Sequence, residues 1–230
     1  MQTTASNANK VGTITCRCGT VTLSLPNPEP KFRCGCCCAD CLQRAYVGAQ
    51  GQPPRAIREL QAPVDLLYVD SLLMPPSEQT RKHLALFKLN GPDAENISLR
   101  ANCCGSVLCT ENQAFHVPYT MATFNNLQPQ TTCFFDPVPK SSLNIFTKDW
   151  PAQQAQALKS AERSQFGAPC PQIADPKNAL DDQNVIDLIN SFQMPAAITP
   201  DDAISFAELR RDMTVQIEPA FFQESRTYRK

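Results

Sequence analysis

Val11–Leu25 reads VGTITCRCGTVTLSL, and this stretch decides the fold. Two β-rich runs, Gly12–Thr15 and Thr20–Leu25, are joined by the short segment Cys-Arg-Cys-Gly. Runs of this kind around a glycine-containing turn predict a β-hairpin. Gly19 can adopt the positive φ that tight hairpin turns often need. The sequence therefore predicts a hairpin whose turn carries two thiols.

Cysteine is abundant, with 12 in 230 residues. All but Cys133 and Cys170 fall within Cys16–Cys41 or Cys103–Cys109. The N-terminal MQTTASNANK lacks the apolar run of a signal peptide, and no segment approaches the roughly 18 apolar residues of a membrane span. We therefore expect a cytoplasmic protein without a membrane partner. In a reducing compartment, metal binding explains such thiols better than disulfides do.

The overall charge excludes one broad class of function. The chain has 21 basic and 22 acidic residues, which gives a formal net charge of -1. Binding to a phosphate backbone requires a basic surface that this composition does not supply. We therefore expect no nucleic-acid partner, and mixed surface charges are the plainer interpretation. At 42% hydrophobic residues, the chain is long enough to bury a core in one or two domains.

The middle of the chain predicts an antiparallel sheet. Strand patterns cover Val64–Val69, His83–Leu89, Ile97–Ala101 and Phe115–Thr123. The intervals between them leave no room for crossover helices, so neighbouring strands should run antiparallel. A short helix is expected at Ala39–Tyr46, directly after the second group of cysteines.

The C-terminal part predicts helices instead. Ala152–Ser164 is rich in Ala, Gln and Lys, and Asp181–Phe192 spaces its apolar residues as helices do. Thr199, followed by proline, has the features of a helix N-cap. We therefore divide the chain into a mainly antiparallel β, zinc-binding domain over 11–145 and a helical extension over 146–230, packed on it.

The hairpin turn is the first candidate metal site. A Cys-x-Cys turn followed by glycine can present Cys16 and Cys18 on one side, whereas two thiols alternating with Arg17 do not form a core pattern. Zinc bound by thiolates prefers a tetrahedron of ligands, which requires ligands from two or more turns. Cys104 precedes Gly105 and is the expected third ligand, and the adjacent Cys103 could supply the fourth sulfur. The alternative is a pair of buried core thiols.

The segment from Cys34 to Cys41, CGCCCADC, is the second candidate site. Only Cys36, Cys38 and Cys41 fit the spacing Cys-x-Cys-x-x-Cys, whose second half is a common zinc-binding pair. Three thiolates leave one zinc position open, which is typical of a catalytic site. Cys34 or Cys37 could instead close that position and make the site structural.

The order of these motifs resembles the glutathione-dependent formaldehyde-activating enzyme and centromere protein V family over about residues 11 to 125. The resemblance implies a β-tent fold of antiparallel sheets around zinc. It also implies that Cys16, Cys18 and Cys104 bind a structural zinc, and that the Cys-x-Cys-x-x-Cys residues bind the catalytic one. The chain departs from the family pattern at Ala101, where the family has a cysteine that Cys103 could replace, and at Cys37, where the family often has histidine.

The resemblance further implies a function. The expected protein is a zinc-dependent carbon–sulfur lyase-like enzyme that acts on a thiol adduct of a small aldehyde or similar electrophile. The resemblance also implies one or two zinc ions per chain, with glutathione as a possible cosubstrate. The alternative is a non-catalytic zinc module that binds another protein.

Five further residues could take part in such chemistry. Arg33, Arg44 and Lys31 flank the second group of cysteines and could hold the carboxylate of a cosubstrate, and arginine is the better choice because it binds carboxylates in a bidentate manner. His116 is a candidate general acid or base, and Tyr119 is a further candidate. A plainer interpretation is solvated surface charge for the flanking cations and a satisfied core residue for the histidine, and Tyr119 is similarly ambiguous.

Overall fold

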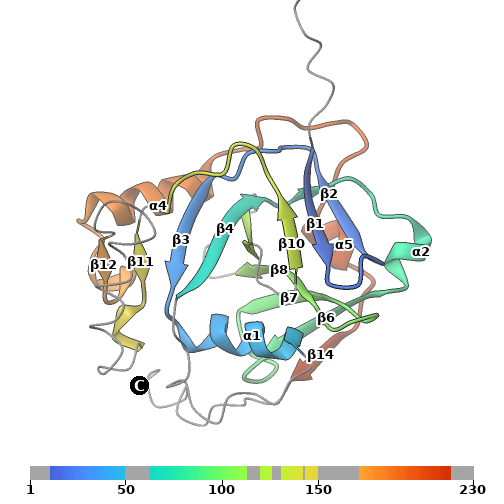
Figure 1. The fold of residues 1–230 in the computed structure, drawn as a ribbon, viewed down its shortest axis with the longest axis horizontal. Helices are drawn as coiled ribbons and strands as arrows, with labels where there is room; N and C mark the ends of the chain where they lie inside the picture. The colour runs from blue at the N-terminus through green and yellow to red at the C-terminus, as the bar shows by residue number, and fades with distance from the viewer. Residues whose placement is uncertain are drawn as a thin grey trace, which may run out of the picture.

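A computed structural model describes residues 11–49, 63–112, 120–125, 131–141, 143–149 and 171–218 of the chain. These residues form antiparallel and mixed β-sheets with few helices, which confirms the predicted mainly-β class (Figure 1). The helix predicted at Ala152–Ser164 lies outside the described residues, and so does the first part of the strand predicted at Phe115–Thr123.

The predicted hairpin is present. β1 (Gly12–Cys16) and β2 (Thr22–Leu25) pair antiparallel, and Thr15 is opposite Thr22 next to the turn. Gly19 has a φ of 77° in that turn, the left-handed region that glycine adopts without steric cost. β10 (Thr131–Phe134) pairs with the other edge of β1, so the described residues form a three-stranded sheet in the order β10-β1-β2.

A larger sheet occupies the middle of the molecule (Figure 1). Within the described residues it has nine strands in the order β12-β11-β3-β4-β9-β8-β7-β6-β14. The six central strands pair antiparallel, as predicted, whereas the outer strands β11, β12 and β14 pair parallel with their neighbours. The strands are β3 (Phe32–Cys36), β4 (Val64–Asp70), β6 (Leu84–Leu89), β7 (Asn96–Ala101), β8 (Val107–Asn112), β9 (Thr120–Phe124), β11 (Asn144–Ile145), β12 (Gln172–Ile173) and β14 (Val215–Glu218).

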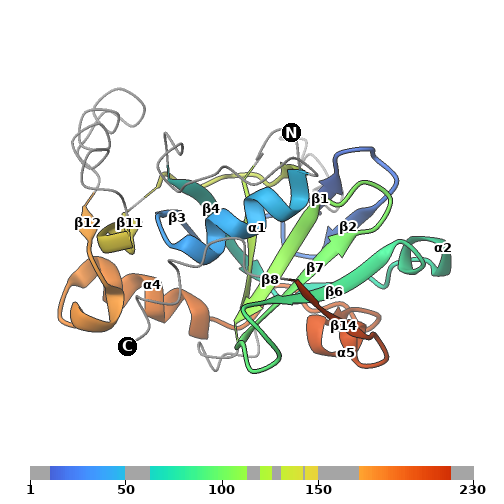
Figure 2. The same ribbon diagram turned by 90° about the horizontal axis from the view of Figure 1, so that it is seen from below.

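The remaining elements are short. β5 (Leu72–Leu73) and β13 (Ile204–Ser205) form a two-stranded antiparallel pair. The helices are α1 (Ala39–Ala49), α2 (Glu78–Arg81), α4 (Gln183–Gln193) and α5 (Phe206–Arg210), with 3-10 turns at Thr147–Asp149 and Pro176–Asn178. Helix α1 begins at the predicted residue and crosses one face of the larger sheet (Figure 2).

The C-terminal segment differs in part from its prediction. α4 forms where a helix is expected, and the side chain of Asp182 caps its first turn. The helix start predicted at Thr199 is wrong, because the chain forms only a turn after it. The next helix begins at Phe206, where Ser205 and Glu208 form a reciprocal capping box. The segment also contributes β12, β13 and β14, so its described residues are not purely helical.

The larger sheet is buried on both faces. Successive residues of β4 belong to two different cores: Leu67 and Val69 pack in one, and Leu66 and Tyr68 in the other. The first core includes the small sheet and α5, and the second includes α1 and α4. A strand buried on both faces shows a nearly continuous apolar run rather than alternation, which matches the sequence of β4.

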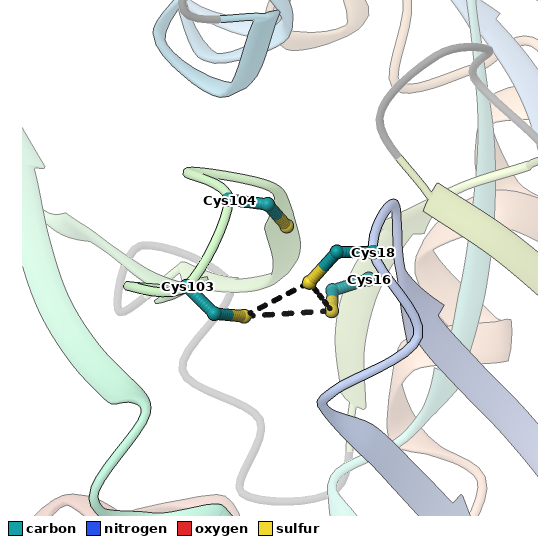
Figure 3. Close-up of side chains that lie close together, drawn as sticks. All are labelled: Cys16, Cys18, Cys103 and Cys104. Carbon is teal, nitrogen blue, oxygen red and sulfur yellow. Dashed lines mark hydrogen bonds between the residues drawn. The ribbon is translucent and has the colours of Figure 1, made fainter.

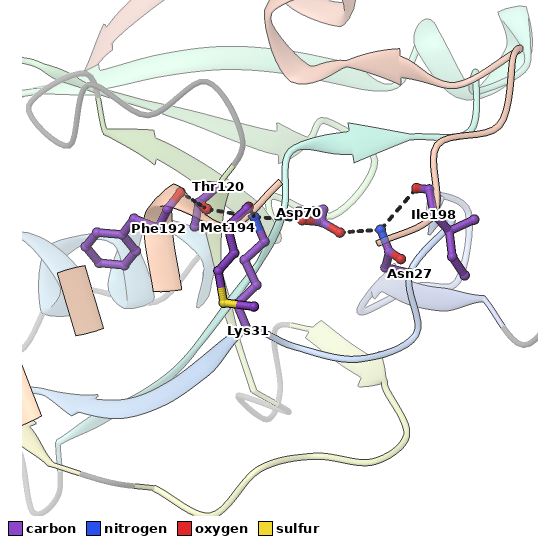
Figure 4. Close-up of polar contacts among 7 residues, drawn as sticks. All are labelled: Asn27, Lys31, Asp70, Thr120, Phe192, Met194 and Ile198. Carbon is purple, nitrogen blue, oxygen red and sulfur yellow. Dashed lines mark hydrogen bonds and ion pairs between the residues drawn. The ribbon is translucent and has the colours of Figure 1, made fainter. Parts of the chain in front are cut away.

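A buried ion pair connects α4 to the sheets (Figure 4). Lys31 Nζ lies 2.7 Å from Asp70 Oδ1, and the two side chains are only 7% and 4% exposed. Lys31 also donates to the Met194 carbonyl at 2.6 Å, and Thr120 Oγ1 donates to the Phe192 carbonyl at 3.0 Å. The last carbonyls of a helix have no partner within the helix. Here Lys31 and Thr120 donate to these carbonyls, and the positive charge of Lys31 suits the negative end of the helix dipole.

The other oxygen of the same carboxylate extends this network. Asn27 Nδ2 donates to Asp70 Oδ2 and, at 3.2 Å, to the Ile198 carbonyl (Figure 4). The buried charge is therefore compensated by a cation on one side and an amide on the other. Asn27 and Lys31, both bound by Asp70, connect the chain before β3 to the chain after α4.

Candidate metal centres

The turn between β1 and β2 forms one half of the first centre. The Gly19 amide donates to the Cys16 carbonyl at 2.9 Å, and the Cys16 amide donates to the Val21 carbonyl at 2.9 Å. The Val21 amide also donates to Cys16 Sγ at 3.3 Å. This tight turn places Cys16 and Cys18 with both sulfurs on the same side, as the Cys-x-Cys-Gly pattern predicts.

The turn between β7 and β8 forms the other half. Gly105 has a φ of 77°, and its amide donates to the Ala101 carbonyl at 2.7 Å. Arg17 joins the two turns: its amide donates to Ser106 Oγ at 3.0 Å, and its guanidinium donates to the Cys104 carbonyl at 2.7 Å. These bonds hold the two turns face to face.

Four sulfurs meet between the two turns (Figure 3). Sγ of Cys18 lies 3.6 Å from Sγ of Cys16 and 3.3 Å from Sγ of Cys103, and the Cys16–Cys103 distance is 3.7 Å. Cys104 completes a group whose sulfurs all lie within 4.8 Å of one another. A tetrahedron with zinc–sulfur bonds of about 2.3 Å has sulfur–sulfur edges of roughly 3.8 Å. The four cysteines therefore fit a tetrahedral metal ion, and Cys103 stands where the fourth sulfur is needed.

The thiols of this first cluster cannot ionise independently. Hydrogen bonds with Thr20 and with Cys103 lower the pKa of Cys18 to about 6. Desolvation and the neighbouring thiols raise the pKa of Cys103 to about 12, and burial raises the pKa of Cys16. The Cys18 thiolate is thus stabilised by Thr20 and by a neighbouring thiol. A divalent cation would replace the remaining protons and allow all four sulfurs to become ligands.

The second cluster lies where β3 ends and α1 begins. Sγ of Cys36 is 3.3 Å from Sγ of Cys38, and the Cys41 amide in the first turn of α1 donates to Cys38 Sγ at 3.3 Å. The three sulfurs of Cys36, Cys38 and Cys41 lie within 4.8 Å of one another. Amide groups at a helix start favour negative charge, so this position suits thiolates.

Gly35 of the CGC motif leaves room for a side chain of the neighbouring strand. A Cβ on Gly35 would lie 2.0 Å from Oδ1 of Asn144 in β11, so a larger residue here would displace the Asn144 side chain. The Cys37 amide donates to the Ile145 carbonyl at 3.0 Å on the same edge. The backbone around the cluster is therefore fixed by β11.

Among the described residues, no fourth cysteine, histidine or carboxylate joins the second cluster. Cys34 and Cys37 are fully buried, yet neither belongs to the group of sulfurs. Cys36 is buried, whereas Cys38 and Cys41 are partly exposed. Among the described residues, the group therefore consists of three sulfurs and does not include Cys34 or Cys37.

The thiols of the second cluster also influence one another's ionisation. Hydrogen bonds from Cys36 and Cys38 lower the pKa of Cys41 well below its usual range, with a further contribution from the charge of Arg44. The same hydrogen bonds, together with burial, raise the pKa of Cys36 well above its usual range. The group thus holds one thiolate in the absence of a cation, and a divalent metal would be needed to ionise the rest.

The two arginines that were predicted to hold a cosubstrate lie in different surroundings. Arg33 forms a bidentate pair with Asp65, with distances of 2.9 Å from Nε and 2.7 Å from the terminal nitrogen, and it also donates to the Pro139 carbonyl. Its carboxylate partner thus comes from the protein itself. Arg44 is 4% exposed, and its Nε donates to Ser98 Oγ at 3.0 Å. A role of either arginine toward a cosubstrate stays a prediction.

One acidic residue near the second cluster has no signal in the sequence. Asp149 ends the 3-10 turn that follows β11, where Ile145 pairs with Cys36. Its Oδ1 is buried and has no hydrogen-bond partner among the described residues. Burial first, and the charge of Cys38 second, raise the pKa of Asp149 to about 6. Its position depends on the pairing of β11 with β3, which no local pattern reveals.

The other candidates are placed as follows. His116 and Tyr119 lie outside the described residues, as does Cys170. Cys109 and Cys133 are buried in the first hydrophobic core, outside both clusters.

Comparison with protein-family models, with curated proteins and with solved structures gives no match. No helix among the described residues is both long and apolar enough to cross a membrane. Two groups of cysteines that could hold metal ions are therefore the features on which function is inferred.

Proposed function

We propose that this protein is a zinc-dependent enzyme of the carbon–sulfur lyase type, which forms or cleaves the adduct of a thiol with a small aldehyde or similar electrophile. The observation that carries the proposal is the cluster of Cys36, Cys38 and Cys41, which has three sulfurs and no fourth protein ligand among the described residues. A zinc ion with three protein ligands keeps one position for a substrate.

The donor set supports zinc as the metal. Thiolates select soft or borderline cations, and a tetrahedral arrangement of sulfur ligands is typical of zinc or of iron–sulfur centres. Zinc bound here would supply a position for a thiolate and polarise the oxygen of a carbonyl compound. Three anionic sulfurs reduce the Lewis acidity of the metal relative to three histidines, so exchange of thiols is better supported than activation of water.

The first cluster would then hold a structural zinc. Its four sulfurs satisfy a tetrahedral ion without any other ligand, and they come from two turns that belong to different sheets. The mainly antiparallel sheet and the order of the cysteine motifs support a fold of the β-tent type, with glutathione as the candidate thiol.

The alternative proposal is a non-catalytic zinc module. It is favoured by the bidentate pairing of Arg33 with Asp65, because that pair already occupies one of the side chains expected to hold a cosubstrate. The two proposals differ in the accessibility of the second metal. An open site with three thiolates accepts an external ligand, whereas a closed structural site does not.

The test is the zinc content of protein purified under reducing conditions without added metal. We expect two zinc ions per chain in the wild type, and the loss of one in each of the variants Cys38→Ser and Cys104→Ser. Cys109→Ala, which removes a sulfur outside both clusters, should keep both ions. One zinc, lost only with Cys104→Ser, would contradict the lyase proposal and favour the structural module.

Catalysis is then tested with glutathione and formaldehyde at equilibrium. The zinc-loaded protein should accelerate exchange between the free aldehyde and its thiol adduct, as measured by NMR exchange spectroscopy. Cys38→Ser should abolish the acceleration, and Cys109→Ala should retain it. Equal exchange rates with and without protein for a panel of thiols and aldehydes would leave the second zinc without this activity.

A further inference from the structure

Arg44 is a buried cation beside the second cluster. It lies three residues after Cys41 in α1, a spacing that places two side chains on the same face of a helix. Only 4% of Arg44 is exposed. Its Nε donates to Ser98 Oγ at 3.0 Å, and Ser98 Oγ in turn lies 3.0 Å from Thr110 Oγ1. Neutral hydroxyl groups of β7 and β8 therefore position the guanidinium.

No carboxylate compensates this charge among the described residues. None of the ion pairs in that part of the chain involves Arg44. Asp40, one turn earlier in α1, accepts a hydrogen bond from Asn90 Nδ2 at 2.9 Å. A guanidinium stays charged at any physiological pH, and burying a charge without a counter-ion is costly. Within the described residues, the candidate anionic partner is the sulfur cluster, whose Cys41 lies one turn before Arg44 on the same face of α1.

The charges of the metal-loaded site fit this pairing. Three thiolates and one divalent cation leave a net charge of minus one on the cluster. Counting only the metal, its three sulfurs and Arg44, the group is neutral before a fourth ligand binds. An anionic fourth ligand then brings the group to minus one, whereas without the arginine it would reach minus two.

We infer that Arg44 is the counter-ion of the Cys36, Cys38 and Cys41 cluster, and that it biases the fourth position toward an anionic ligand such as a thiolate. Arg44 acts through the cluster and does not need to touch the substrate. This role rests on the proposed function, since it requires a divalent metal at the second cluster. It gives a physical reason why a site with three thiolates would still accept another thiolate.

The experiment uses the full chain loaded with cobalt in place of zinc, because the visible absorption of cobalt reports its ligands. 2-Mercaptoethanol, which binds as a thiolate, and neutral imidazole are titrated in parallel. Difference spectra cancel the first cluster, whose four sulfurs leave no open position. In Arg44→Met, the affinity for the thiolate should fall about tenfold relative to the affinity for imidazole. Arg44→Lys should retain most of the preference, and the exposed control Arg81→Met should match the wild type.

The ratio of the thiolate affinity to the imidazole affinity separates an electrostatic effect from a folding defect. A folding defect lowers both affinities, whereas loss of the positive charge lowers mainly the affinity for the thiolate. Arg44→Gln, which can still hydrogen-bond with Ser98, provides a second neutral variant if Arg44→Met does not fold. An equal loss of affinity for both ligands would indicate a merely structural role and overturn the inference. An unchanged ratio in variants that bind cobalt and thiol would also overturn it, while leaving the proposed function intact. Failure of the wild-type second cluster to bind cobalt would instead contradict the proposed function.

Discussion

The sulfur atoms of Cys18 and Cys103 lie 3.3 Å apart, although 85 positions separate the two residues in the sequence. One belongs to the hairpin turn of the small sheet and the other to the β7–β8 turn of the large sheet (Figure 3). A metal ion held by both turns is therefore a cross-link between the sheets.

Removing that ion should destabilise the fold. A ligand present at about a thousandfold excess over its dissociation constant stabilises a folded protein by about 4 kcal/mol. We expect a chelator under reducing conditions to lower the melting temperature of the wild type, and to lower that of Cys103→Ser much less. Cys38→Ser, which alters only the other cluster, should keep most of the chelator effect of the first. Equal chelator effects in the wild type and Cys103→Ser would contradict a structural metal at the first cluster.

The buried pair of Lys31 and Asp70 should contribute far more to stability than an exposed pair. Removing one partner of a buried ion pair leaves an uncompensated charge and costs about 3 kcal/mol. Lys31→Met should show this loss in denaturant-induced unfolding. Lys148→Met, which removes the lysine of the more exposed pair with Asp175, should cost less than about 1 kcal/mol. The double variant Lys31→Met, Asp70→Asn should recover part of the loss, and similar costs for the two lysine variants would refute this prediction.

Asp149 should make the stability of the protein depend on pH. Its folded-state pKa of about 6 exceeds its ordinary value of 3.8, so the folded state holds this proton more tightly than the unfolded state. Its stabilising contribution is complete below about pH 4 and is lost as the pH rises through 6. We therefore expect Asp149→Asn to be more stable than the wild type above pH 6. The difference should be only about 1 kcal/mol, because solvent screens the partly exposed carboxyl group.

The measurement for Asp149 is denaturant-induced unfolding of both proteins, metal-free and reduced, between pH 4 and pH 7. The difference between the two curves isolates the one carboxyl group from all others. A constant difference across this range would show that Asp149 titrates normally.

The capping box of α5 should be worth more than the N-cap of α2. Ser205 accepts from the Glu208 amide and Glu208 returns the bond, in a helix that buries Phe206. Ser77 caps α2, which buries no residue. Ser205→Ala should therefore lower the free energy of unfolding by about 1 kcal/mol, and Ser77→Ala by clearly less. Urea unfolding of both variants tests this ranking, and a larger cost for Ser77→Ala would reverse it.

Local patterns were sufficient for part of this fold. The hairpin, the start of α1 and the strands β4, β6 and β7 depend on apolar or β-rich runs and turn residues within a few positions. β3 could not be predicted, because Phe32–Cys36 (FRCGC) contains no β-branched residue. Its extended conformation depends on pairing with β4 on one edge and β11 on the other. The parallel partner of β6 comes from the far end of the chain, so no local signal marks it.

The candidate sites also contain some features that local sequence predicts and others that depend on contacts between distant segments. Cysteine spacing was enough to group Cys36, Cys38 and Cys41, because these residues lie in one short segment. The meeting of Cys103 with Cys18 depends on how two turns face each other, so the sequence left the fourth ligand open. The burial of Arg44 beside Ser98 depends on packing of α1 against β7, and the approach of Asp149 depends on β11.

The parallel strand β14 has a consequence for how the protein is made. It covers the outer edge of β6, and it is the last described element of the chain. During synthesis, most of the large sheet emerges before this partner exists, and an uncovered strand edge can pair with other chains. The nascent protein therefore passes through a period in which β6 is exposed to misassembly. That period ends only when Val215–Glu218 has left the ribosome.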